Sequence, residues 1–207
     1  MNSTKIRNAA RRRGITSLYH FTPSANLESI LVNGLVSRRI LDEHQVAYTY
    51  TDGWRNDGQP DAVSLSIHDI NRSMFSQKMR NSRCTWVILE VDASVLWTHP
   101  CRFCWVNAAS SEIVNHSGFI GGPWAFEKMF ADCAVSAIDQ RSSREVHNTR
   151  ENMPTMNDAE VQVLAPIAPD LIRDVTVARD GNREAIEAAM KNAGRILPIA
   201  VVPDVFS

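Results

Sequence analysis

The stretch from Thr85 to Val91 constrains the fold most, because it is almost entirely apolar and rich in β-branched and aromatic residues. The run is too short for a typical helix, and its single charge, Glu90, interrupts it only once. Continuous apolar runs of this length are typical of strands buried on both faces. We therefore expect this segment to lie centrally in a sheet.

Further strands and a few helices are predicted around it. Strands are expected over Ile15 to Phe21, Ala62 to Ile67, Val161 to Ala165, Val175 to Ala178 and Ile199 to Val202. Helices are expected over residues 3–13, from Ser24 to a stop at Gly34, over Ala125 to Ala131 and over Arg183 to Ala193. Several strands with few, irregularly placed helices favour an α+β fold over a doubly wound sheet.

The size and composition indicate one globular domain. The chain has 207 residues, of which 44% are hydrophobic and 22% charged, close to the averages of folded proteins. It has no run near the roughly 20 apolar residues that span a bilayer, and it begins without a secretory signal pattern. We expect a soluble, cytoplasmic protein with no membrane partner.

The net charge of −1 argues against holding nucleic acid by bulk electrostatics. The basic residues are nevertheless clustered, which keeps a phosphate-bearing substrate plausible. The clusters comprise Lys5, Arg7 and Arg11 to Arg13, then Arg38 and Arg39, then Arg72, Lys78, Arg80 and Arg83.

The four cysteines predict reduced, mostly buried thiols. Cys101 and Cys104 form a C-x-x-C pair, but Cys84 and Cys133 do not supply the second half of a zinc site. We expect no bound metal.

Five positions can carry chemistry, of which four come before the last long polar stretch. His20 and Thr22 lie two apart on a predicted strand, so both side chains can contact one ribose or diphosphate. The pair alone favours a hydrogen-bonded structural histidine in a half-buried strand. Arg55, beside Trp54 in the long segment 36–60, can bind a diphosphate through two N–H groups of its guanidinium. Asn107 follows an aromatic stretch and offers a donor for a nucleobase or nicotinamide.

Glu160 opens an apolar strand after a long polar stretch. A carboxylate placed there is held by the sheet and partly desolvated, which suits a general base or a group that stabilises a cation. Alone it reads as a structural residue, so its case depends on the other positions.

Taken in order, these motifs resemble the DarT-type nucleic-acid ADP-ribosyltransferases. The segments that carry the resemblance are Tyr19-His20-Phe21-Thr22, Asn26 to Leu31, Gly34-Leu35, Arg55 to Gly58, Ser64 to Ile67, Met74-Phe75, Trp86 to Asp92, Phe103 to Ser110 and Ala159 to Leu164. The resemblance implies the ADP-ribosyltransferase fold, with two small, mainly antiparallel sheets forming an NAD cleft and helices around them. It also implies NAD as co-substrate, no metal, and a base in a single strand as acceptor.

The resemblance also assigns roles to residues. His20, Thr22 and Asn26 are expected to bind NAD, Arg55 to hold its diphosphate and stabilise the transition state, and Glu160 to be the catalytic carboxylate. Within a single domain spanning 1–207, residues 1–14 would form a basic helix, 36–60 a loop at the NAD site and 139–158 a loop that reads the substrate. The candidate contacts to the acceptor strand are Trp54, Asn107, Arg141 and Arg144.

The acceptor is the least determined feature. The segments at 57–61 and at Phe103-Cys104 resemble the guanine-modifying branch of the family more than the thymine-modifying one. This resemblance implies guanine rather than thymine in single-stranded DNA, and RNA is the alternative. A protein that keeps the fold but binds nucleotides without catalysis is the second alternative. The family resemblance implies a toxin of a toxin and antitoxin pair or an anti-phage effector, with a macrodomain antitoxin as partner.

Overall fold

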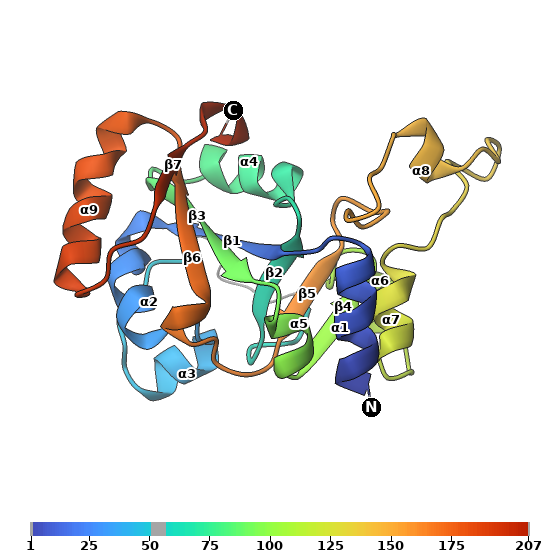
Figure 1. Ribbon diagram of the computed structural model, residues 1–207, viewed down its shortest axis with the longest axis horizontal. Helices are drawn as coiled ribbons and strands as arrows, with labels where there is room; N and C mark the ends of the chain where they lie inside the picture. Colours follow the sequence, from blue (N-terminus) through green and yellow to red (C-terminus); the bar gives the residue numbers. More distant parts are fainter. Residues whose placement is uncertain (1, 51–56, 207) are drawn as a thin grey trace.

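A seven-stranded sheet forms the centre of the computed structural model, which describes residues 2–50 and 57–206 (Figure 1). The strand order is β4-β5-β2-β1-β3-β6-β7. The strands are β1 Ser17–Pro23, β2 Val63–Ile67, β3 Trp86–Asp92, β4 Cys101–Cys104, β5 Glu160–Val163, β6 Ile172–Val177 and β7 Ile199–Val201. Neighbouring strands are antiparallel except β6 and β7, which are parallel.

The sheet consists of two halves that meet along a very short seam. Strands β1 and β2 pair only at Leu18 with Ile67 and at Tyr19 with Ser66, whereas β1 pairs with β3 along its whole length. The α+β fold is as expected, but the two expected sheets are joined into one strand order. One sheet forms instead of two because these two residue pairs join the halves at one end. Beyond them, β1 and β2 are no longer paired.

Nine helices surround the sheet in the part of the chain that the structure describes. They are α1 Asn2–Arg12, α2 Leu27–Asn33, α3 Arg38–Glu43, α4 Arg72–Arg80, α5 Val95–Thr98, α6 Ser111–Val114, α7 Pro123–Lys128, α8 Ser143–Val146 and α9 Arg183–Asn192. Four of them, α1, α2, α7 and α9, lie where helices were expected. Helices α3 and α4 were missed, although Ser37 and Asn71 mark their starts by accepting hydrogen bonds from the Ile40 and Met74 amides.

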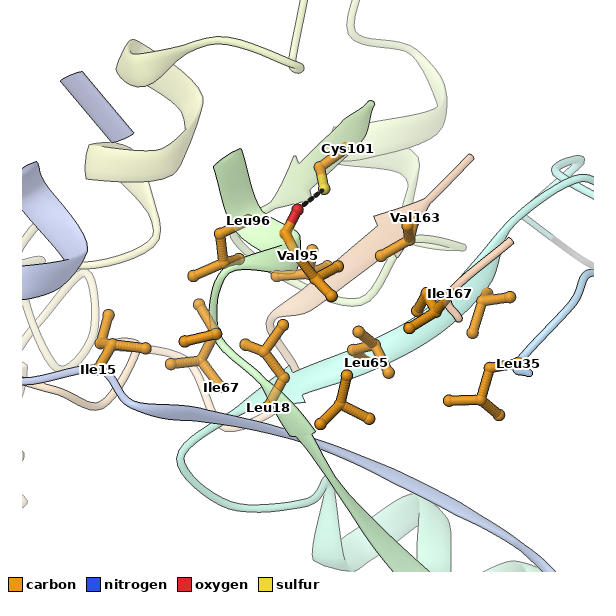
Figure 2. Close-up of a cluster of buried hydrophobic side chains, with 14 of the residues drawn as sticks. Ile15, Leu18, Leu35, Leu65, Ile67, Val95, Leu96, Cys101, Val163 and Ile167 are labelled. Carbon is orange, nitrogen blue, oxygen red and sulfur yellow. Dashed lines mark hydrogen bonds between the residues drawn. The ribbon is translucent and has the colours of Figure 1, made fainter. Parts of the chain in front are cut away.

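The core lies on both faces of the sheet, as the sequence of β3 predicts. Val87, Leu89 and Val91 belong to the main cluster of buried side chains, which Figure 2 shows in part. Trp86 and Ile88 pack on the opposite face in a smaller cluster with Phe75 of α4. Strand β3 is therefore buried from two sides, between β1 and β6.

The segment 139–158, which includes α8, projects from the side of the molecule that carries α6 and α7 (Figure 1). Half of its residues are exposed and only Ser143 and Pro154 are buried, and the segment leads into β5. Among residues 2–50 and 57–206, no helix is long and apolar enough to cross a bilayer.

Gly34 predicts a large difference between two glycine substitutions. Its φ is +84°, and a Cβ atom there would lie 2.2 Å from the carbonyl oxygen of Ile167, which accepts a hydrogen bond from the Leu35 amide. Gly34→Ala should lower the free energy of unfolding by about 3 kcal/mol, because it adds a backbone clash to the left-handed strain. Urea unfolding monitored by circular dichroism measures this change.

Gly14→Ala is the matched control. Gly14 also has a positive φ, +67°, but a Cβ atom there would meet nothing within 4 Å. It should cost only the strain of the left-handed conformation, about 1 kcal/mol. Equal losses in the two variants would contradict the close approach of residues 34 and 167.

Candidate active site

A cavity of about 460 Å³ opens where β1 and β2 separate. His20, Thr22 and Asn26 line it from one half of the sheet, and Ser64 and Glu160 line it from the other. Its volume lies in the range of pockets that hold small molecules and cofactors. Residues far apart in the chain are therefore brought together at one site.

His20 connects the two halves beyond the point where their ladder stops. Its Nδ1 lies 2.9 Å from the Ser64 carbonyl oxygen. Because a carbonyl oxygen only accepts hydrogen bonds, we assign the ring proton to Nδ1, which leaves a lone pair on Nε2. Burial lowers the pKa of His20, while the hydrogen bond to Ser64 acts in the opposite direction. The ring is therefore neutral at pH 7 and offers an acceptor to a hydroxyl group of a ligand.

Asn26 fastens the segment before residue 51 to the end of β1. Its Nδ2 donates to the Thr49 carbonyl at 2.8 Å and to Thr22 Oγ1 at 2.9 Å, and its Oδ1 accepts from the Thr49 amide at 2.7 Å. We call these three hydrogen bonds of Asn26 the clamp. Thr22 is buried, and Tyr48 and Tyr50, which flank Thr49, line the cavity. One amide side chain thus fixes this wall of the cavity.

Glu160 begins β5 and is paired with Cys104 of β4. Two residues further along the strand, the fully buried Gln162 donates from Nε2 to Asp57 Oδ2 at 2.6 Å and, more weakly, to Glu160 Oε1 at 3.4 Å. Arg102 donates to Gln162 Oε1 at 2.6 Å, so both ends of the amide are held. Gln162 was not among the expected site residues, although its spacing of two from Glu160 places both side chains on one face.

The cavity wall also includes the cations Arg38 and Lys78 and the amide of Asn107. Arg38 lies over the ring of Tyr50, 5.5 Å from its centroid. Asn107 Oδ1 accepts from the Ala109 amide at 2.9 Å, so part of its side chain closes a turn. Arg55 and Trp54, expected at this site, lie outside the described residues.

Arg141 and Arg144, the other two expected substrate contacts, do not line the cavity. Arg141 pairs with Asp139 at 2.6 Å. Arg144 donates to the carbonyls of Met153 and Arg150 and to Thr155 Oγ1, so it braces the segment 139–158 from inside.

The same segment is tied to the body of the protein at two consecutive residues. Arg13, at the end of α1, contacts the Glu151 carboxylate at 3.4 Å. Asn152 donates to His68 Nδ1 at 3.1 Å, just beyond the end of β2. The chain leading to Glu160 is therefore held from both sides.

The cysteines of the C-x-x-C pair are buried thiols, as expected. Burial raises the pKa of Cys101 and of Cys104 to about 12, with nearby Glu160 adding to the shift at Cys104. Such thiols are poor nucleophiles. The described residues hold no cluster of three or more groups suited to a metal ion.

Comparison with known proteins identifies a family for this arrangement. Residues 19–207 match the family model described as "ssDNA thymidine ADP-ribosyltransferase, DarT". No curated protein matches the sequence.

Solved structures share the fold at low sequence identity. Thermus sp. 2.9 DarT in complex with NAD⁺ has a TM-score of 0.60 at 14% identity, covering 93% of this chain and 98% of that one. The same protein in complex with ADP-ribosylated ssDNA has a TM-score of 0.59 at 14% identity, covering 94% and 97%. Thermosipho africanus DarTG in complex with ADP-ribose has a TM-score of 0.56 at 17% identity, and the match covers 92% of this chain but half, 50%, of that chain.

The half-buried, neutral His20 predicts a pH-dependent stability. Because its pKa in the folded protein lies below 6.5, the unfolded chain binds more protons as the pH falls through that value. The free energy of unfolding should therefore decrease between pH 7.5 and 5.5, and part of this decrease should be absent in His20→Asn, whose amide can still donate to Ser64. Urea unfolding at both pH values measures it.

His44→Asn, at the exposed end of α3, is the control and should follow the pH dependence of the unchanged protein. An undiminished decrease in His20→Asn would show that His20 does not contribute.

Proposed function

The chain belongs to the DarT family, and we propose that it transfers ADP-ribose from NAD to a base in single-stranded DNA. The family match extends over nearly the whole chain. The protein is accordingly an ADP-ribosyltransferase with NAD as its co-substrate. The residue roles and the acceptor base below are our proposals.

The observation that carries the proposal is the set of groups around one cavity. Glu160 lines it beside His20 and Thr22, with the cations Arg38 and Lys78 in the same wall. A dinucleotide requires hydroxyl acceptors and donors for its riboses and positive charge for its diphosphate. We assign the ribose contacts to His20 and Thr22, the support of that wall to Asn26, and the diphosphate to Arg38, Lys78 and Arg55.

The reaction follows from the position of the carboxylate. When the bond between the ribose C1 atom and nicotinamide breaks, its electron pair leaves with nicotinamide and positive charge develops on the ribose. Glu160 stabilises this charge, and the lone pair of the acceptor base then forms the new bond to C1. Glu160 takes the proton released by the base. Gln162, fixed by Arg102 and Asp57, acts as a positioning residue for the carboxylate.

The acceptor base is best supported as thymine, with guanine as the alternative. The description of the family model names thymidine. The expectation of guanine depended partly on Phe103 and Cys104, whose side chains are fully buried and cannot touch a base. Asp57, the other part of that argument, lines the cavity. The preference for guanine therefore stays a prediction to be tested against thymine.

We propose a toxin or anti-phage role for the enzyme in the cytoplasm, with a macrodomain protein that removes ADP-ribose as its antitoxin. The support is the family membership. Growth arrest on expression, relieved by co-expressing a macrodomain hydrolase, tests this role.

Glu160→Gln should reduce ADP-ribose transfer at least about 100-fold while leaving NAD affinity within twofold, because it removes the charge that acts in the transition state. The enzyme and radiolabelled NAD are incubated separately with thymine-only single-stranded DNA, guanine-containing single-stranded DNA, duplex DNA and RNA. The nucleic acids are then digested, and mass spectrometry identifies the modified nucleoside. Glu187→Gln, an exposed carboxylate on α9, is the control and should keep full activity.

The outcomes separate the proposals. Label on thymidine supports the proposal as stated, and label on guanosine or only on RNA replaces the acceptor but keeps the enzyme. No label on any nucleic acid, or equal labelling by Glu160→Gln, would falsify the assigned mechanism.

Asn26→Ala should weaken NAD binding about tenfold, because three hydrogen bonds that fix the cavity wall are lost. Isothermal titration calorimetry with a non-hydrolysable NAD analogue measures the affinity. Asn33→Ala, an exposed asparagine on the neighbouring α2, removes one surface hydrogen bond and should leave it unchanged. Equal affinities in both variants would mean that the clamp does not support the NAD site.

A further inference from the structure

A second cavity, of about 560 Å³, lies beyond the end of β2 and has no role in the mechanism above. It is bounded by the segment from His68 to Arg72, the segment from His147 to Met153 and the C-terminal residues Val202 and Val205. The side chain of Tyr19 also lines it.

This cavity adjoins the candidate active site along three separate stretches of chain. Tyr19 lines both cavities. Ser66 and Asn71 line the first, while His68 and Arg72, their near neighbours in sequence, line the second. The chain that bounds the second cavity at Met153 reaches the first at Asp158. The two cavities therefore share a wall at Tyr19, and a strand in the first cavity passes close to the second.

The groups around the second cavity favour an anion. Its titratable lining residues are Tyr19, His68, Asp69, Arg72, His147 and Arg150. Asp69 is the one carboxylate among them, and it is already paired with Arg72 at 2.9 Å. The exposed guanidinium of Arg150 has no hydrogen-bond or ion-pair partner within residues 2–50 and 57–206. A guanidinium group without a partner presents several N–H donors in one plane, and this arrangement suits a phosphate.

Local geometry supports a formed site. His68 and Asn148 both line the cavity, and both have positive φ, +68° and +48°. Asn152 donates to His68 Nδ1, which leaves the proton of the neutral ring on Nε2 as a further donor. The contact also holds the segment that carries Arg150 against the end of β2.

We propose that this second cavity binds a backbone phosphate of the acceptor strand, at a nucleotide flanking the modified base, with Arg150 as its principal contact and Arg72 and His68 beside it. The inference rests on the proposed function, since it needs a single-stranded polynucleotide in the first cavity. It assigns Arg150 to strand binding and leaves the transfer chemistry to Glu160.

The test measures the binding of a fluorescent single-stranded oligonucleotide at several salt concentrations, without NAD turnover. Arg150→Ala should weaken binding roughly tenfold and should reduce the slope of log affinity against log salt by about 0.7, the value for one lost phosphate contact on a single strand. Arg150→Lys should keep the slope and lose less affinity. Arg179→Ala, which removes an exposed arginine outside both cavities, is the control.

A second measurement identifies the phosphate. Oligonucleotides that carry one neutral methylphosphonate linkage at successive positions should include one position that weakens the unchanged protein about as much as Arg150→Ala does. At that position the substitution should have no further effect on Arg150→Ala. If every position weakens both proteins equally, Arg150 does not contact the backbone and the inference fails.

The failure of this inference is distinct from failure of the proposed function. A protein that modifies single-stranded DNA, with Arg150→Ala matching the unchanged protein in affinity and salt slope, overturns only the second site. Competition by inorganic phosphate without any effect of the oligonucleotide also overturns it, because the site would then bind a free anion. A protein that modifies no nucleic acid overturns the function itself.

Discussion

The hydrogen bond from His20 to the Ser64 carbonyl controls how the two halves of the sheet are joined. If the ladder between β1 and β2 continued past Tyr19 and Ser66, backbone pairs would close the space that is now the main cavity. If nothing replaced it, a partly buried carbonyl would be left without a partner, at a cost of about 1–3 kcal/mol. The His20 side chain bridges β1 and β2 where their backbones are not paired, and the main cavity lies in the space between them.

The same contact determines the chemistry of the histidine. By donating from Nδ1, the ring keeps Nε2 as an acceptor, and burial keeps the ring uncharged. On the other side of the cavity, Gln162 plays a comparable role for Glu160, since its amide is fixed by Arg102 and Asp57 before any ligand arrives. Groups that are oriented in advance do not have to be ordered during the reaction. The cavity wall thus contains pairs in which one residue lines the cavity and its neighbour fixes its orientation, as the proposed roles of His20 and Glu160 require.

Patterns local in sequence predicted the fold well, and contacts between distant segments were harder to foresee. The apolar run of β3 placed it centrally, and glycine stops located the ends of α1 and α2. The joining of two sheets into one was missed because it depends on two residue pairs between β1 and β2. The strand positions of Glu160, His20 and Thr22 predicted a shared site, and all three line the main cavity. The contacts of Gln162 were not predicted, because a buried glutamine resembles any polar strand residue until its partners are known. Arg144 carries the charge of a strand-binding residue, but its three contacts brace its own segment.

Arg13 connects a helix outside the residues matched by the family model to residues inside that range. It lies at the end of α1, before residue 19 where the family match begins, yet it contacts Glu127 of α7, the ring of Phe130 and Glu151. The segment that leads to Glu160 is therefore supported by a helix outside the matched region. A substitution at Arg13 would therefore change the stiffness of that segment while every residue around the main cavity stays the same.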